Sequence, residues 1–323
     1  MINKQLVRPD WMIGEAKQMR DGFGEALAEL GEEIGDLVVL TADLGSSLRL
    51  NEFKEKFPER YFNVGVAEQN MIGVAAGLAA EGFRVVTTSF AVFSPGRSWD
   101  QIRVSVSYSQ ANVKIVGSHG GLATGEDGAT HQALEDVAMM QVLPEMTVLA
   151  PSDWEQTKEA TKAMLNYEGP VYLRLVRPKT AVLAKKTEFE IGKAYVYRWG
   201  EDVTVLAYGI QVEEALKAAE RLSQKGVEVE VINVSTLKPL DKETILTSIK
   251  KTGRVVVAED HQLIGGLGSE VARLLASEGL AVEFQQIGVR NKFGESGDWR
   301  KLYRKYGLDA KAIEERAKLL FEN

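Results

Sequence analysis

The most constraining feature of this chain is a repeated alternation of short apolar runs with longer stretches of helical periodicity. The first strand-like runs are residues 37–40, 84–89, 113–117, 147–150 and 171–176. The helical stretches between and before them are residues 23–34, 69–80, 99–108, 132–141 and 153–166. Such alternation predicts an α/β fold with a parallel sheet covered by helices on both faces.

A second alternating set follows a less hydrophobic, Lys-rich stretch at residues 178–193, which we interpret as a domain linker. This set predicts strands at residues 203–208, 227–234 and 254–259 and helices at 212–222, 242–250 and 269–277. The 323 residues are enough for two domains. We therefore predict two doubly wound α/β domains, residues 1–185 and 186–323.

Composition excludes several classes of function. With 39 basic and 46 acidic side chains, a net charge of -7 and no basic run, a nucleic-acid partner is not expected. The absence of cysteine excludes disulfides, thiolate metal sites and cysteine nucleophiles. Residues 1–10 lack a signal-peptide core and no apolar run is long enough for a bilayer, so we expect a cytoplasmic protein without a membrane partner.

Glu68 opens the helix that begins near residue 69, and the helix is unusually rich in small residues. A carboxylate at this position could simply complement the helix dipole. Small side chains allow another backbone to approach closely, which favours a helix pairing across a soluble interface. These small residues are Gly73, Ala75, Ala76, Gly77, Ala79 and Ala80.

The loop of residues 118–132 contains His119, Asp127 and His131 together with four glycines. Loops at the carboxyl ends of parallel strands are where open α/β sheets bind ligands. Two alternatives remain at this level, a metal site built from these three residues and a polar surface loop with incidental histidines. Phe90 and Phe93, at the end of a predicted strand, could likewise be ordinary core residues.

Residues 61–71, followed by the small-residue helix, resemble the pyrimidine-binding domain of transketolases. The runs Gly125-Glu126-Asp127-Gly128 and Thr130-His131-Gln132 match the same family. Residues 233–241 resemble the C-terminal domain of transketolases and their relatives, which contacts no cofactor in the family. The resemblance covers nearly the whole chain but only the second and third of the three transketolase domains.

The resemblance implies that the chain contributes to a thiamine diphosphate site. Glu68 would hydrogen-bond N1′ of the aminopyrimidine and promote the tautomer that deprotonates the thiazolium C2. A carboxyl group that shares a proton at neutral pH needs a dry setting that raises its pKa. Phe90 and Phe93 would border or stack on the aminopyrimidine. Asp43 matches a cofactor-site acid near the subunit contact.

The resemblance also implies a site for a sugar phosphate. His131 would contact the C1 hydroxyl of the donor and Asp127 the C2 hydroxyl, while His119 would lie nearer the phosphate end. The positions that match phosphate-binding residues of the family are Arg20, Ser47 and Arg177. At Pro95-Gly96-Arg97 the sequence departs from single-chain transketolases, which have a tyrosine nearby.

The missing first domain carries the family's metal-binding motif, a Gly-Asp-Gly followed by an asparagine, and this chain has no such motif. We therefore expect no metal ligand here, with Mg²⁺ or Ca²⁺ bound by a separate N-terminal-section subunit. The chain, which begins just ahead of the pyrimidine domain, is expected to be complete. Together the two subunits would form a two-plus-two heterotetramer that moves a two-carbon ketol unit from a ketose phosphate to an aldose phosphate.

Three other functions fit parts of the same pattern. They are the C-terminal half of a 1-deoxyxylulose-5-phosphate synthase, the beta subunit of a 2-oxo-acid dehydrogenase decarboxylase, and a non-catalytic assembly subunit. In the second domain, residues 263–269 resemble an incomplete dinucleotide fingerprint whose glycine spacing is wrong for a phosphate loop. We interpret this stretch as a close-packing turn and the preceding His261 as structural.

Overall fold

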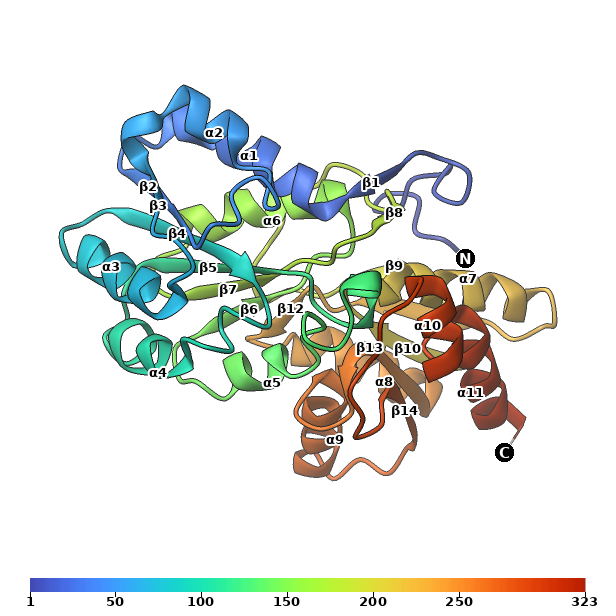
Figure 1. Cartoon of the computed structure of the whole chain (residues 1–323). Helices are drawn as coiled ribbons and strands as arrows, with labels where there is room; N and C mark the ends of the chain where they lie inside the picture. Colours follow the sequence, from blue (N-terminus) through green and yellow to red (C-terminus); the bar gives the residue numbers. More distant parts are fainter. Residues whose placement is uncertain (323) are drawn as a thin grey trace.

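The computed structural model describes residues 1–322 and contains two sheets built mainly of parallel strands (Figure 1). The larger sheet has the order β12-β6-β7-β5-β4-β2-β3. Its strands are β2 (Leu37–Thr41), β3 (Tyr61–Asn63), β4 (Arg84–Phe90), β5 (Val113–Ser118), β6 (Thr147–Leu149), β7 (Val171–Arg174) and β12 (Thr236–Lys238). Only β12 runs antiparallel to its neighbour, β6.

Helices cover both faces of this sheet because successive strand residues point to opposite sides. On one face, Val39, Val86 and Val116 pack with α1 (Met19–Glu33) and α6 (Trp154–Asn166). On the other face, residues such as Leu40, Val85 and Ile115 pack with α3, α5 and the π-helical turn η2. These elements are α3 (Glu68–Ala80), α5 (Asp136–Gln141) and η2 (Ile102–Tyr108).

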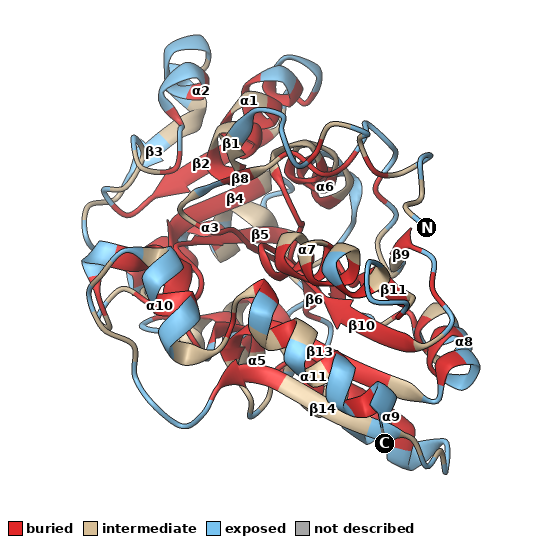
Figure 2. Cartoon of the chain, turned by 90° about the vertical axis from the view of Figure 1, so that its right-hand side faces the viewer, coloured by how far each residue is buried: buried red, intermediate tan, exposed pale blue. Residues whose placement is uncertain are grey.

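The smaller sheet has the order β14-β13-β10-β11-β9. Its strands are β9 (Tyr195–Arg198), β10 (Val203–Ala207), β11 (Val229–Asn233), β13 (Arg254–Gln262) and β14 (Glu283–Val289). One face packs against α7 (Gln211–Ser223), α10 (Trp299–Tyr306) and α11 (Ala310–Glu322). The other packs against α8 (Lys242–Thr252) and α9 (Leu267–Ser277). Figure 2 shows buried strands between helices whose outer residues are exposed, which confirms the predicted α/β class.

The predicted helix at residues 132–141 is wrong over its first four residues, because α5 begins only at Asp136. The backbone before it is engaged by segments that are distant in sequence. Gly121 N–H donates to the Ala133 carbonyl at 2.7 Å, and Gln262 N–H donates to the Leu134 carbonyl at 2.8 Å. These bonds use carbonyl groups that a helix would need for its own first turn.

The predicted helix at residues 99–108 forms, but only α4 (Trp99–Gln101) is α-helical and the remainder is η2. Several short or late elements were not predicted. They are β1 (Ala16–Gln18), α2 (Asn51–Lys56), η1 (Pro58–Arg60), β3, η3 (Leu122–Asp127), β8 (Lys179–Ala181), β9, β12, β14, α10 and α11.

The stretch predicted as a linker is packed against the rest of the chain. Its strand β8 pairs antiparallel with β1, and the side chain of Asp153 accepts hydrogen bonds from the N–H groups of Leu183 (2.6 Å) and Ala184 (2.5 Å). The second half of the chain also supplies β12 to the larger sheet. A boundary between residues 185 and 186 stays a prediction.

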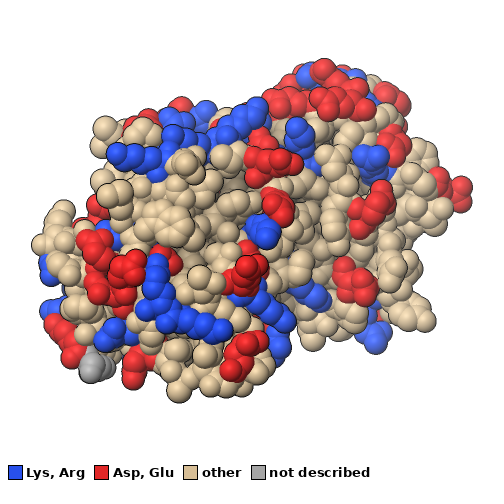
Figure 3. Space-filling view, turned by 180° about the vertical axis from the view of Figure 1, so that it is seen from behind, with Lys and Arg blue, Asp and Glu red and all other residues tan. Residues whose placement is uncertain are grey.

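On the face shown in Figure 3, basic and acidic side chains alternate in small groups. Within residues 1–322, every helix is too short or too polar to cross a membrane.

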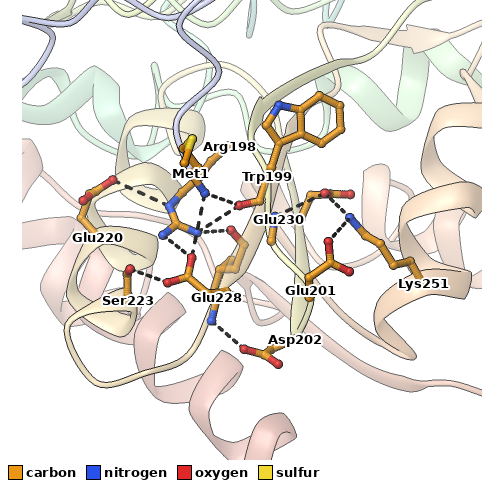
Figure 4. Close-up of polar contacts among 12 residues, drawn as sticks. Met1, Arg198, Trp199, Glu201, Asp202, Glu220, Ser223, Glu228, Glu230 and Lys251 are labelled. Carbon is orange, nitrogen blue, oxygen red and sulfur yellow. Dashed lines mark hydrogen bonds and ion pairs between the residues drawn. The ribbon is translucent and has the colours of Figure 1, made fainter.

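A buried arginine ties β9 to its neighbours in the second sheet (Figure 4). The Arg198 side chain is 3% exposed and donates to the Val229 carbonyl at 2.6 Å and to Glu228 at 2.8 Å. Ser223 donates to the same Glu228 carboxylate, and the amino group of Met1 donates to the Trp199 carbonyl. This cluster therefore fastens the start of the chain to the second sheet.

Replacing Arg198 by methionine should lower the free energy of unfolding by about 2 kcal/mol, because it leaves the buried Val229 carbonyl without this donor. Urea denaturation measures this change. The matched control is Arg221→Met, whose side chain is 52% exposed and lies 3.8 Å from Glu314; it should cost less than about 0.5 kcal/mol. Equal losses in the two variants would contradict the anchoring role of Arg198.

Candidate functional site

Glu68, the first residue of α3, has a buried carboxylate that pairs with a cation. Its side chain is 4% exposed, and Nη1 of Arg97 lies 3.1 Å and 3.2 Å from its two carboxylate oxygens. The arginine side chain itself is half exposed. Sequence reasoning noted that Arg97 departs from the family pattern but missed this contact. A carboxylate held at a buried helix start is itself a signal that a cation lies nearby.

An aromatic cluster connects this ion pair to the two loop histidines. The Arg97 guanidinium lies 4.1 Å from the centre of the Phe93 ring, and the His131 ring lies 5.2 Å from Phe93 at a steep angle. Phe90 lies 5.9 Å from Phe93 and stacks on His119, with ring centres 3.7 Å apart. The structure thus brings the predicted pyrimidine residues and the predicted sugar residues into one continuous cluster.

His119 is held in an unusual backbone conformation, with φ of 62°, directly after the end of β5. Its Nδ1 lies 2.7 Å from the Ser118 hydroxyl, and Thr124 donates to its carbonyl at 2.7 Å. Burial, followed by the nearby cations Arg20 and Arg177, lowers the pKa of His119 to about 2. The imidazole is therefore neutral at physiological pH and serves as a hydrogen-bonding group rather than a proton reservoir.

The cationic residues predicted to bind phosphate converge beside this histidine. Arg20 is 8% exposed and donates from Nη1 to the Ser47 carbonyl at 2.7 Å, while its Nε is buried without a partner among the described residues. Burial and the neighbouring Arg49 lower the pKa of Arg20 to about 10. An anion at this point would satisfy the Nε donor and relieve the repulsion between the two guanidinium groups.

Arg177 contacts the acidic loop that follows His119. It donates to Glu126 at 2.6 Å and to the Thr124 carbonyl at 3.0 Å, and its Nε lies 3.9 Å from Asp127. Asp127 is a partly exposed member of the short helix η3. The loop carboxylates thus hold Arg177 in place at the surface.

Asp43 lies at the carboxyl end of β2 with φ of 61°. It exchanges two 3.0 Å hydrogen bonds with Asn63, the last residue of β3. These bonds lead to the neighbouring strand rather than to Glu68 or the aromatic pair. The predicted role of Asp43 near a subunit contact stays a prediction.

The donor set fits one end of the expected cofactor. A buried carboxylate and two phenyl rings suit a nitrogen heterocycle, which stacks on aromatic faces and hydrogen-bonds through its ring nitrogen. Over residues 1–322, no three His, Asp or Glu side chains gather as metal ligands. The alternative of a metal site at His119, Asp127 and His131 is therefore unsupported, and Glu68, Phe90 and Phe93 suit the pyrimidine end of the cofactor rather than a metal-bound diphosphate.

The glycine-rich turn at residues 263–269 packs closely, as predicted. The Glu259 carboxylate accepts hydrogen bonds from Leu267 N–H at 2.8 Å and Gly268 N–H at 3.0 Å, so a side chain already fills the anion position at the start of α9. His261 is fully buried, with Nδ1 2.7 Å from the Gln262 carbonyl oxygen. Both features are structural.

The depressed pKa of His119 predicts how pH affects the fold. An unfolded histidine takes up a proton near pH 6.5 while the folded one does not, so unfolding becomes easier as pH falls below 6.5. Each pH unit below 6.5 should lower the free energy of unfolding by up to about 1.4 kcal/mol more than in the His119→Gln variant. Urea denaturation from pH 5 to 8 measures the difference, and NMR should show no titration of the His119 ring. A titration midpoint near 6.5 would contradict the burial argument.

Comparison with protein families assigns both halves of the chain. Residues 15–181 match the family model for the transketolase pyrimidine-binding domain, and residues 192–313 match that for the transketolase C-terminal domain. These matches agree with the resemblance inferred from residues 61–71 and 233–241.

Individual relatives are similar over nearly the whole chain. A protein described as a transketolase C-terminal section, from Methanocaldococcus jannaschii, is 47% identical over 94% of this chain and 96% of its own length. A 6-deoxy-6-sulfo-D-fructose transketolase subunit from a Clostridium species is 45% identical over 93% of both. One of the subunits of an apulose-4-phosphate transketolase from Phocaeicola vulgatus is 36% identical over 91% of this chain and 94% of its own length.

Among solved structures, a split-gene transketolase described as an inactive beta4 tetramer superposes with a TM-score of 0.88 at 43% identity, covering 94% of this chain and 98% of its own. The Campylobacter jejuni transketolase shares the fold, with a TM-score of 0.78 at 22% identity over 48% of its length. The chain therefore belongs to the thiamine-diphosphate-dependent transketolase family and comprises that family's pyrimidine-binding and C-terminal domains.

Proposed function

We propose that this chain transfers a two-carbon ketol unit from a ketose phosphate to an aldose phosphate when assembled with a separate subunit that binds the diphosphate and its metal ion. The observation that carries the proposal is the continuous cluster from Glu68 through Arg97 and Phe93 to the two histidines. It joins groups suited to an aminopyrimidine with groups suited to a sugar. The cytoplasmic location expected from the sequence remains part of the proposal.

Thiamine diphosphate, when bound, would supply a nucleophilic carbon and an electron sink for cleavage of the C2–C3 bond of the sugar. The task of this chain is to orient and polarise. Glu68 would hold a proton at the pyrimidine ring nitrogen, and its burial keeps water away from that proton. The Phe90 and Phe93 rings would fix the plane of the heterocycle.

At the sugar end, His131 and Asp127 would hydrogen-bond the hydroxyl groups of the donor next to the reacting carbon. His119, which is neutral, would donate or accept a hydrogen bond without carrying charge into the channel. Arg20, Arg177 and Ser47 would bind the phosphate, with the buried Nε of Arg20 as an available donor. This division places the charged end of the substrate beside His119, at the end of the cluster opposite Glu68.

A second copy of this chain would pair with it across a two-fold axis where α3 presents small residues, and the diphosphate-binding subunit would pair with the same domain. A methyl group built on Gly73 or Gly77 meets no atom within 4 Å, so the outer face of this helix is open in the chain alone. Val74 on this face and the nearby Phe62 and Val66 are exposed apolar residues. We include in the proposal a two-plus-two heterotetramer assembled around this face; the similar split-gene protein is described as a beta4 tetramer when inactive.

The proposal is tested by measuring ketol transfer from xylulose 5-phosphate to ribose 5-phosphate with thiamine diphosphate and Mg²⁺. The chain is assayed alone and then mixed with the diphosphate-binding subunit encoded in the same genome. Activity only in the mixture supports the proposal. Turnover by the single chain would overturn partner dependence, and an inactive but stable complex would overturn the transketolase assignment for these sugars.

Replacing Glu68 by glutamine in the assembled enzyme should lower kcat by a factor of about 10² to 10⁴, the range for loss of a positioned proton-transfer group. Steady-state kinetics measure the change. Glu81→Gln, at the exposed opposite end of α3, is the matched control and should leave kcat within a factor of about two. Unchanged activity in Glu68→Gln would favour the non-catalytic assembly subunit.

Replacing Arg20 by methionine should raise KM for the phosphorylated donor by a factor of about ten or more, because it removes a charge-assisted hydrogen bond to phosphate. The kcat should change much less, since the reacting carbon is remote from the phosphate. Arg84→Met, at the opposite, amino end of β4, is the control. Equal KM values for the two variants would remove Arg20 from the phosphate site.

The second candidate is a 1-deoxyxylulose-5-phosphate synthase-like activity. A Geobacter sulfurreducens protein with that name is 38% identical over 90% of this chain, although this chain spans only 46% of its length. The two functions differ in donor, since the synthase takes pyruvate. Assaying the mixture with pyruvate and with a ketose phosphate separates them. Two relatives are named for other sugars, a sulfo-sugar and apulose 4-phosphate. The same assay, run with different ketose donors, therefore determines which sugars this chain prefers.

A further inference from the structure

The loop that carries most of the predicted sugar-binding residues is held by a buried acid from the second half of the chain. Asp260, in β13, is 1% exposed. Its carboxylate accepts hydrogen bonds from Leu122 N–H at 2.8 Å and from Ala123 N–H at 3.1 Å. The Tyr303 hydroxyl donates to the same carboxylate at 2.7 Å. The two amides are the first two of η3, the short helix that ends at Asp127.

Arg174 connects the same acid to the other end of the loop. Its guanidinium pairs with Asp136 at 2.8 Å and donates to the carbonyl groups of Asp260 at 2.9 Å and Ala133 at 3.3 Å. The side chains of Arg174 and Asp136 are both almost completely buried. The loop is therefore fixed after His131 as well as before Asp127.

Residues 294–296, which follow β14, contact the middle of the loop. Gln132 Nε2 donates to the Glu295 carbonyl at 3.0 Å, and the Ser296 hydroxyl donates to the Glu126 carbonyl. A side chain at Gly294 would overlap the Gln132 amide, so the two segments are in close contact. Segments of the second half thus contact the loop on two sides.

The loop needs such support because its own backbone is strained. His119, Gly121, Gly125 and Gly128 all have positive φ, and only glycine adopts such angles without cost. The first amides of a helix have no partner within it, so an external acceptor stabilises them. A carboxylate at this point supplies that acceptor. Burial raises the pKa of Asp260, while Arg174 and the three hydrogen bonds oppose that rise.

We propose that Asp260 is a positioning residue for substrate binding, acting through Leu122 and Ala123 to set the loop geometry that presents His119, Asp127 and His131. The second half of the chain contains none of the predicted site residues, yet through this acid it would determine how the donor sugar binds. The proposal rests on the proposed function, because it assigns the loop to the sugar.

The test compares Asp260→Asn with Asp153→Asn, both in the full chain assembled with its diphosphate-binding partner. Asp153 is an equally buried acid that also accepts hydrogen bonds from backbone amides, those of Gln156, Leu183 and Ala184, but it does not hold the loop. The two variants should lose similar stability. A merely structural role for Asp260 therefore predicts similar kinetics in both.

The positioning role predicts a selective effect of Asp260→Asn. KM for the ketose phosphate should rise by a factor of about ten with a smaller change in kcat, and amide exchange at Leu122 and Ala123 should accelerate about tenfold or more. Asp153→Asn should leave KM and the amide exchange at Leu122 and Ala123 at wild-type values. Tyr303→Phe removes one donor from Asp260 with little change in volume and should shift both readouts in the same direction by less.

Wild-type exchange in the loop of Asp260→Asn, or equal kinetic changes in the two Asn variants, would overturn the positioning role. If Asp260→Asn does not fold, Tyr303→Phe decides by the same criteria. If the wild-type assembly transfers no ketol unit, the proposed function fails; loop exchange then decides separately whether Asp260 holds the loop.

Discussion

Parallel strand pairing is the constraint on which the candidate site depends. In the larger sheet β2, β3, β4, β5 and β7 run in one direction, so their carboxyl ends meet at one edge. Asp43, Phe93, His119 and Arg177 each follow such an end within three residues, and Glu68 follows the end of β3 by five. Glu68 and Arg97, which are 29 positions apart, and Phe93 and His131 thereby become neighbours.

In the proposed function, the chemistry at that edge would be divided between recognition of rings and recognition of anions. Burial keeps water away from Glu68 and keeps His119 neutral. The guanidinium of Arg20 is also buried, where its charge is costly without an anion. Among the described residues the Arg20 Nε therefore has no partner, whereas Glu68 pairs with Arg97.

Much of this arrangement could be predicted from the sequence because its signals are local. Apolar runs identified the long strands, and the motif around Glu68 identified the helix start. The helix expected from residue 132 failed, since its first carbonyls bond to Gly121 and to Gln262. Strands of three residues, such as β12, are too short to show an apolar pattern that would identify them in the sequence. In the sequence Asp260 is one acid on an apolar strand, and nothing local indicates that it reaches Leu122.

The claim that this chain holds only half of a cofactor site is tested most directly by calorimetric titration of thiamine diphosphate with Mg²⁺. The cofactor is titrated into the chain alone and then into its mixture with the diphosphate-binding subunit. Saturable binding at one cofactor per subunit pair is expected in the mixture, with weak or undetectable binding to the chain alone. Equally tight binding to the single chain would contradict it, because that chain would then contain a complete site.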